Sequence, residues 1–303
     1  MSVSSPKTGI YIKVLSALSF TFMTTCIKAL EGAIPTGEVV FFRSFISLIP
    51  LFLWLRYQGN VRSLIRTHSV TSHLLRGISG SCAMFLNFLA LAYLPLADAV
   101  MLGYAAPLLT VVLAAVLLKE HVRGDRWLGV LVGFVGVLVV LSPHLMSAGP
   151  GRDGMGTAVW IGTALGFAGA CGSALSAVQI RRMSRTEKPG SIVLYFSLLT
   201  TVIGGLTIVL GWKMPSGPQL ALLIGAGIFG GIGQTLMALS VRHAEASLIA
   251  PFEYTTMLWS VLIAYGVFGE LPTVATFIGG ALIAGSGIYT IWRQSRPAAM
   301  PAR

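Results

Sequence analysis

The chain has 303 residues, of which 55% are hydrophobic and only 10% are charged, and its formal net charge at pH 7 is +11. Soluble globular domains carry about 25% charged residues, so this composition excludes an ordinary soluble protein. The basic residues fall in short gaps between apolar runs, which indicates membrane topology rather than nucleic-acid binding. We therefore expect a multi-pass membrane protein that binds no nucleic acid.

Ten apolar runs have the length that a membrane-spanning helix needs, which is about 20 residues. In chain order they are 10–30, 39–57, 74–93, 98–118, 127–141, 157–180, 191–212, 220–239, 246–268 and 274–292. The fifth run is short, and we expect that helix either to start nearer Gly124 or to tilt less than its neighbours. The first run is too long for the core of a signal peptide and is expected to remain as the first span.

Positive charge orients these helices. With the N-terminus in the cytoplasm, most of the 21 lysines and arginines fall on the cytoplasmic side. Lys28, Arg43, Arg152 and Lys213 then lie outside or near the outer ends of helices. Because ten is an even number, both termini are predicted to be cytoplasmic.

The chain also repeats itself. Residues 117–136 align with residues 265–287 in a register that pairs Glu120 with Glu270 and Gly129 with Gly279, both at an offset of 150. Five helices per half is an odd number, so the second half enters the membrane in the opposite orientation. Inverted repeats are typical of secondary transporters that move around a site at the bilayer midplane. We divide the chain into a first five-helix repeat, residues 1–146, and a second, residues 147–303, which ends in a short cytoplasmic tail.

Small residues offer close contacts between the predicted helices. Three GxxxG pairs permit close backbone approach, and some arise by chance because the chain contains 35 glycines. Ordinary packing is the simpler interpretation, and contacts that move during transport are the alternative. The pairs are Gly129 with Gly133, Gly162 with Gly166 and Gly227 with Gly231.

Residues 246–272 combine an apolar run with a deep acid, a proline and aromatic rings. In a helix that starts near Ala246 and rises about 1.5 Å per residue, Glu253 would lie about 10 Å into a hydrocarbon layer about 30 Å thick. A carboxylate at that depth needs a partner, water or a proton. We expect Glu253 to bind a substrate ammonium group or a coupling proton, or else to be a structural acid that is hydrogen-bonded to a helix terminus or paired with Arg43 or Lys28.

Arg43 and two prolines are further candidates. Arg43 lies one turn into the second run, where an arginine can extend to the outer surface or pair with a nearby acid such as Glu38 or Asp98. If it faces a cavity instead, its two-pronged guanidinium can bind a substrate carboxylate. Pro107 and Pro251, in the fourth and ninth runs, are expected to kink those helices near the binding site.

Five segments carry a resemblance to a known family: VVFFRSF (39–45), LLRGISGSCAMFLNFLALAYLPLADA (74–99), APLLTVVLAAVLLKE (106–120), RWLGVLVGFVGVLVV (126–140) and APFEYTTMLWSVLIAYGVFGELP (250–272). The whole chain resembles the ten-helix, EamA-type branch of the drug/metabolite transporter superfamily. The resemblance implies an all-α membrane protein with ten transmembrane helices, as two inverted five-helix repeats around a central cavity lined by helices 1, 3, 4, 6, 8 and 9. It also implies a bacterial inner-membrane carrier, most like the aromatic amino-acid exporters.

Aromatic and amide side chains lie on the helices that the resemblance assigns to the cavity, away from the interfacial belts where aromatic residues are common. Each alone is more simply explained by packing. Together, amides among rings fit a largely apolar pocket with a few orienting hydrogen-bond groups. The expected substrate-binding set is Phe20, Phe85, Asn87, Tyr104, Trp160, Gln179, Gln234, Tyr254 and Trp259.

Enzyme functions have little support. The histidines lie in connections without metal-binding spacing, no Walker A motif occurs, and the three cysteines show no paired spacing. We therefore expect no catalytic residue, no metal and no cofactor.

The sequence predicts an alternating-access exporter, secondary or facilitative, of small metabolites, with aromatic amino acids as the favoured substrate. The alternatives are a regulated solute pore or channel, and an exchanger of nucleotide sugars or other metabolites with the same fold. The expected partners are a small-molecule substrate and membrane lipid. A monomer is expected to be functional, because one chain already contains both inverted halves.

Overall fold

The computed structural model describes residues 6–30, 32–57, 67–117, 124–147, 155–183, 186–243 and 250–294, and the regular structure within these ranges is helical. Here α marks an α-helix and η a 3-10 helix. In chain order the helices are α1 (Pro6–Lys28), α2 (Thr36–Tyr57), α4 (Val70–Leu91), α5 (Leu96–Gly103), α6 (Ala105–Leu117), α7 (Gly124–Ser147), α8 (Met155–Met183), α9 (Pro189–Leu206), η1 (Thr207–Leu210), α10 (Gly217–His243), η2 (Ala250–Tyr254), α12 (Thr255–Phe268) and α13 (Val274–Gln294).

These helices form ten crossings, which confirms the predicted all-α membrane fold. Within the described ranges, 7 segments are long and apolar enough to span a membrane, and shorter apolar helices cover Trp127–Pro143 and Val274–Tyr289. Three crossings consist of two elements: α5 and α6 make the fourth, α9 and η1 make the seventh, and η2 and α12 make the ninth. The fifth helix does start at Gly124, which removes its apparent shortness.

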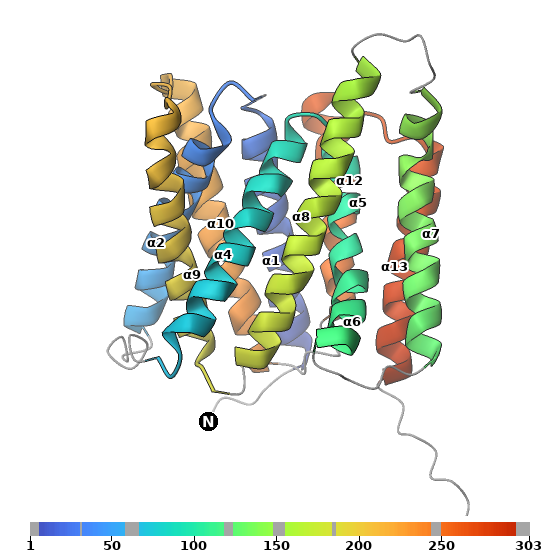
Figure 1. Ribbon diagram of the computed structural model, residues 1–303, viewed down its shortest axis with the longest axis horizontal. Helices are drawn as coiled ribbons and strands as arrows, with labels where there is room; N and C mark the ends of the chain where they lie inside the picture. Colours follow the sequence, from blue (N-terminus) through green and yellow to red (C-terminus); the bar gives the residue numbers. More distant parts are fainter. Residues whose placement is uncertain are drawn as a thin grey trace, which may run out of the picture.

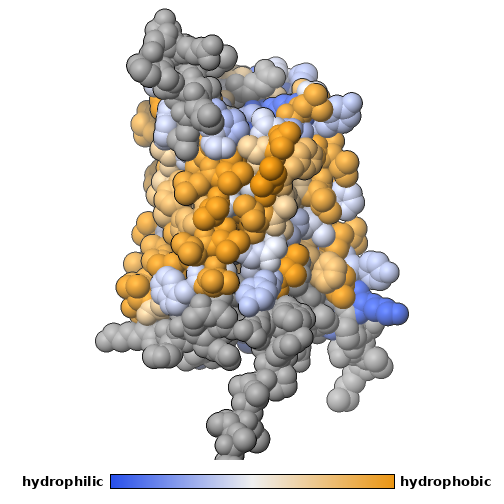
Figure 2. Space-filling view, turned by 90° about the vertical axis from the view of Figure 1, so that its right-hand side faces the viewer, coloured by the Kyte–Doolittle hydropathy of each residue, from blue (hydrophilic) through white to orange (hydrophobic). Residues whose placement is uncertain are grey.

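The helices stand side by side in one upright bundle (Figure 1). The start of α1 and the end of α13 lie on the same side, at the bottom of the view, which we call the N-terminal side. The opposite end of the bundle is the far side. Figure 2 shows an apolar band across the middle of one face with more polar residues near its margins, as lipid contact requires. Exposed apolar residues of α7 include Leu131 and Leu138, and those of α13 include Phe277.

The two halves interlock. The first crossing, α1, packs mainly on the eighth, α10, and the third crossing, α4, packs on the sixth, α8. These two contacts are equivalent under exchange of the halves. The second crossing packs on the seventh (α2 with α9), and the fifth packs on the tenth (α7 with α13). Exchange of the two halves converts each of these two pairs into itself. The contacts thus have the two-fold relation that inverted repeats produce.

Glycines allow this close packing. A Cβ added at Gly162 would meet Tyr93 and Leu94, and one added at Gly227 would meet Ile46, so these predicted GxxxG positions lie directly against neighbouring helices. The closest approach joins α7 to α13, where a Cβ at Gly279 would meet backbone atoms of the facing helix. Small residues at such contacts let membrane helices approach closely.

The sequence predicted kinks in the fourth and ninth crossings, and each of these crossings is divided into two helical elements. α5 ends at Gly103 and Tyr104 forms a turn before α6 begins at Ala105. Pro107 therefore lies in the first turn of α6, where its missing N–H leaves no helical hydrogen bond unmade. Pro251 lies in the 3-10 helix η2, and the predicted start of this span, Ala246, falls outside the described residues.

Candidate functional site

The two interrupted crossings meet at their breaks. The rings of Tyr104 and Tyr254 lie 5.1 Å apart, centroid to centroid, at an interplanar angle of 31°. The Tyr104 hydroxyl donates a hydrogen bond of 2.9 Å to the backbone carbonyl of Glu253. Tyr104 and Tyr254 are separated by 150 residues, the offset that also relates Glu120 to Glu270. Two repeat-related tyrosines therefore meet where the two halves come together.

This junction has the features of a transport site. The helical geometry changes here within the right-handed region, since Tyr104 has φ −72° and ψ −6° and Tyr254 has φ −66° and ψ −10°. Discontinuous helices commonly frame the binding sites of transporters. Tyr104 is buried and Tyr254 is half-buried. A Cβ at Gly287 of α13 would overlap the Tyr254 ring, so this glycine makes room for the ring.

A charged pair lies beside the tyrosines. Lys13 Nζ of α1 lies 3.4 Å from Glu253 Oε2; the Lys13 side chain is 8% exposed and that of Glu253 is 55% exposed. The partner of Glu253 is therefore Lys13, and the expected pairing with Arg43 or Lys28 was wrong. Because the carboxylate is more than half exposed, solvent weakens the pair and a ligand can reach the acid.

The far side of the bundle is tied together by Lys28, the last residue of α1. Its ammonium group donates hydrogen bonds to the carbonyls of Leu94, at 2.6 Å, and Leu91, at 3.2 Å. It also lies 3.8 Å from Glu270 Oε1, and Glu270 Oε2 accepts a 2.9 Å hydrogen bond from the N–H of Leu96. A cation at the end of α4 and an acid at the start of α5 both match the helix dipoles.

Local backbone geometry places Glu270. Gly269 ends α12 with φ 66°, the left-handed conformation that glycine adopts without strain. The N–H of Glu270 bonds the carbonyl of Ala264 and the N–H of Gly269 bonds that of Tyr265, which is the Schellman arrangement. The helix end therefore turns Glu270 toward Lys28.

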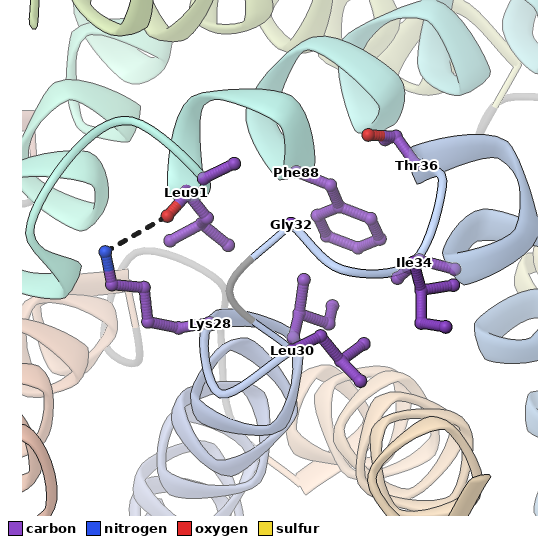
Figure 3. Close-up of a pocket in the computed structure, with 10 residues that line it drawn as sticks. Lys28, Leu30, Gly32, Ile34, Thr36, Phe88 and Leu91 are labelled. Carbon is purple, nitrogen blue, oxygen red and sulfur yellow. Dashed lines mark hydrogen bonds between the residues drawn. The ribbon is translucent and has the colours of Figure 1, made fainter. Parts of the chain in front are cut away.

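Figure 3 shows the space that remains beside this tie, between the α1–α2 connection and the end of α4. Its volume is about 20 Å³, and a single water molecule needs roughly 10–15 Å³. Phe88, Leu91 and Ile34 contribute apolar walls, and Lys28 points its ammonium group to the Leu91 carbonyl. A metabolite cannot pass through a space of this size, so the far side is closed here.

Comparison with known proteins identifies the family. The chain matches the family model described as the EamA-like transporter family over residues 7–142 and again over residues 160–292. The chain belongs to the EamA-like transporter family. It is therefore a small-metabolite transporter and not an enzyme, and its two matches correspond to two EamA repeats.

Several relatives of this EamA-like transporter align along nearly their whole length. The pseudopaline exporter CntI of Pseudomonas aeruginosa is 28% identical over 91% of this chain and 93% of its own. The S-adenosylmethionine uptake transporter of Rickettsia felis is 27% identical (95% and 94%), and the riboflavin transporter of Vibrio cholerae is 26% identical (96% and 95%). A solved crystal structure matches with a TM-score of 0.67 at 22% identity, covering 96% of this chain and 100% of the solved chain, which shows the fold.

The remaining predicted substrate contacts lie on α1, α4, α8, α10 and α12. Phe20 packs against the backbone at Gly233, next to the half-buried Gln234. Phe85 packs against a buried apolar cluster between the helices. Asn87 donates hydrogen bonds to the Ala83 carbonyl at 2.8 Å and to Ser173 Oγ at 3.3 Å, so it links α4 to α8.

Three further members of the set have different surroundings. Trp160 is 46% exposed near the start of α8. Gln179 Oε1 and Trp259 Nε1 are buried and have no hydrogen-bond partner within the described part of the chain. The EamA-like transporter thus brings Tyr104 and Tyr254 together, and a direct substrate contact stays a prediction for every member of the set.

Sequence reasoning missed Lys13, which it treated as a topology charge at the cytoplasmic end. The side chain is instead buried within α1. The available signal was its position inside an apolar run, because an ionisable residue within a membrane segment is a functional candidate. Arg43 was expected to reach the surface or pair with an acid, but it is 3% exposed and its Nε contacts Met23 Sδ at 3.4 Å.

On the N-terminal side, the connection between α8 and α9 carries a buried acid. Glu187 Oε1 accepts hydrogen bonds from Thr67 Oγ1 and His68 N, both at 2.7 Å, and from Ser69 N at 3.1 Å. His73 Nε2 lies 3.6 Å from Glu187 Oε2. Burial raises the pKa of Glu187, but the three hydrogen bonds and His73 together outweigh it, so the net effect lowers this pKa below its usual range.

Proposed function

We propose that this EamA-like transporter is an alternating-access carrier for metabolites with a zwitterionic head and an aromatic ring, with aromatic amino acids as the favoured substrates. The observation that carries the proposal is the charged pair of Lys13 and Glu253 beside the adjacent, tilted rings of Tyr104 and Tyr254. One cation and one anion lie next to an aromatic surface, and this arrangement complements such a molecule.

The pair can exchange partners with a substrate. The carboxylate of an amino acid competes with Glu253 for Lys13, and its ammonium group competes with Lys13 for Glu253. Each exchange replaces one ion pair by another, so the buried charge of Lys13 is not left alone in the membrane. The substrate ring stacks on the tyrosines, since aromatic pairs add about 0.5–1.5 kcal/mol beyond their buried area.

Alternating access follows from the inverted halves. The tie of Lys28 and Glu270 keeps the far side closed, so in this conformation the substrate reaches the tyrosine junction from the N-terminal side. The distribution of basic residues supports an N-terminal side in the cytoplasm, with both termini there. The bacterial relatives support placement in a bacterial inner membrane and, for the pseudopaline exporter, outward transport.

The test is uptake of labelled phenylalanine and tryptophan into liposomes that contain the purified protein, with and without a pH gradient. Alanine and a nucleotide sugar serve as competitors, and S-adenosylmethionine and riboflavin are included because relatives carry them. We expect saturable aromatic uptake that neither competitor inhibits. Absence of aromatic transport by folded protein would remove this substrate class.

Two variants test the charged pair. Glu253→Gln keeps the size and hydrogen bonding of the side chain but removes its charge, so we expect a raised KM for phenylalanine and loss of any pH dependence that the acid provides. Lys7→Gln, at an exposed lysine near the start of α1, is the matched control and should behave as wild type. Unchanged transport and pH dependence in Glu253→Gln would refute the role of this acid.

A further inference from the structure

Two arginines lie inside the membrane-spanning part of the bundle, away from the tyrosine junction. Arg43 belongs to α2 and Arg76 to α4, and both helices are apolar enough to span a membrane. Arg43 contacts Met23 of α1, which is ten residues, or about 15 Å of helix, from Lys13. Arg43 is therefore separate from the Lys13–Glu253 pair.

Arg43 is buried and Arg76 is half-buried, and each guanidinium group has buried N–H donors that are unused. Arg43 Nη1 and Arg76 Nε and Nη1 have no hydrogen-bond partner within the residues that the structure describes. The ion pairs found in these residues involve neither arginine. Arg76 Cζ instead lies 4.1 Å from the centroid of the Phe196 ring, an arrangement that satisfies charge but not the N–H donors.

Arg76 also acts on Arg43, because its positive charge disfavours the charge of Arg43 in a medium of low polarity. Arginine does not release its proton under ordinary conditions, which leaves two positive charges to be balanced. An oxyanion between them is the simplest counter-charge, because the planar fork of arginine matches carboxylate and phosphate oxygens.

The surrounding helices leave room for these side chains. A Cβ at Gly80 would overlap the Arg76 guanidinium, and a Cβ at Gly230 would lie 3.1 Å from Arg43 Nε. Ser44, which follows Arg43 in α2, and Ser197, which follows Phe196 in α9, have buried hydroxyl groups without hydrogen-bond partners in the described chain. The glycines and unused donors have the character of a built polar site rather than of a packed core.

We propose that Arg43 and Arg76 bind the carboxylate or phosphate group of a soluble metabolite. This site goes beyond the proposed function, because it would bind the acidic group of a ligand at a place other than Lys13. The burial of Arg43 favours a metabolite that enters the bundle over the headgroup of a surrounding lipid.

The test measures thermal unfolding of the full chain in nanodiscs of neutral phosphatidylcholine, titrated with benzoate, succinate or inorganic phosphate. Benzamide, the neutral analogue of benzoate, is the ligand control. We expect saturable stabilisation by at least one anion and none by benzamide. Arg43→Gln and Arg76→Gln should each weaken that anion roughly tenfold or more, whereas Arg56→Gln, at an exposed arginine of the same helix α2, should not.

The wild-type titration uses no variant, so its result does not depend on whether a variant folds. Gly80→Ala is a further variant, because its added methyl group displaces the Arg76 guanidinium without changing any charge. Wild-type protein that gives no anion response, or the same response to benzamide, would overturn the proposal. Stabilisation that occurs only with anionic phosphatidylglycerol in the nanodisc would overturn it in favour of a lipid site. Failure of phenylalanine transport alongside arginine-dependent anion binding would refute the proposed substrate and leave this site intact.

Discussion

Lys28→Met should open the far side of the transporter. In the closed arrangement Lys28 makes two hydrogen bonds to carbonyls of the α4 end and an ion pair with Glu270, and these side chains are 17% and 27% exposed. A hydrogen bond from a charged donor stabilises by at least about 1.5 kcal/mol. Loss of the two Lys28 hydrogen bonds therefore destabilises the closed state by about 3 kcal/mol. The partly exposed ion pair, whose N–O distance is 3.8 Å, adds less than about 1 kcal/mol. Since about 1.4 kcal/mol is a factor of ten, the ratio of closed to open protein should fall about 100-fold.

Cysteine labelling measures this ratio. Ile34 lines the small space beside Lys28 and is 4% exposed, so Ile34→Cys, with the native cysteines replaced, reports opening. A membrane-impermeant maleimide added on the far side should label it up to about 100-fold faster in Lys28→Met. Lys213→Met, at an exposed lysine on the same side, is the control. An unchanged rate in Lys28→Met, or an equal rise in Lys213→Met, would refute the reasoning.

Three further predictions address packing, pH and the junction. Gly279→Ala should lower Tm through an overpacking cost of about 1–3 kcal/mol, because its Cβ meets the backbone of α7, whereas Gly285→Ala on the same helix enters open space. Equal Tm values for these two variants would contradict that contact. Glu187→Gln should cost about 1–3 kcal/mol near neutral pH. Because the folded pKa of Glu187 is lowered, its stabilisation is present above the unfolded pKa and is lost as pH falls through the folded value, so unfolding curves of variant and wild type should converge in acid. A difference in stability that stays constant with pH would argue against this account. Tyr104→Phe removes the hydroxyl bond to the Glu253 carbonyl, and KM for phenylalanine should rise roughly two- to tenfold, as a net hydrogen bond of about 0.5–1.5 kcal/mol implies. A wild-type KM would exclude this hydroxyl from shaping the site.

The membrane-spanning segments and the internal repeat could be predicted from the sequence. The segments depend on local composition, and the repeat depends on a constant residue offset and on the number of helices in each half. Apolar length finds a crossing wherever about 20 such residues follow one another. The alignment of Glu120 with Glu270 required only a constant offset, and an odd number of helices per half then implied inversion. The contacts of α1 with α10 and of α4 with α8 agree with that inversion.

The breaks and the ion pairs could not be predicted in the same way. Hydropathy is equally high on both sides of Tyr104, so an apolar window does not show where α5 ends. Lys13 and Glu253 are 240 residues apart, and only tertiary packing brings them together. Arg76 follows a connection rich in basic residues, which made a topology signal the simpler interpretation until the structure showed it stacked on Phe196.

The central claim is that this protein is a carrier whose binding site lies where the fourth and ninth crossings meet at Tyr104 and Tyr254. A counterflow experiment tests this claim most directly. Liposomes with purified protein are loaded with unlabelled phenylalanine and diluted into a trace of labelled phenylalanine. The account predicts transient uphill accumulation of label that saturates with substrate and is reduced in Tyr104→Phe and Glu253→Gln but not in Lys7→Gln. Label that only equilibrates downhill, without saturation and equally in all variants, would indicate a pore and contradict alternating access at this junction.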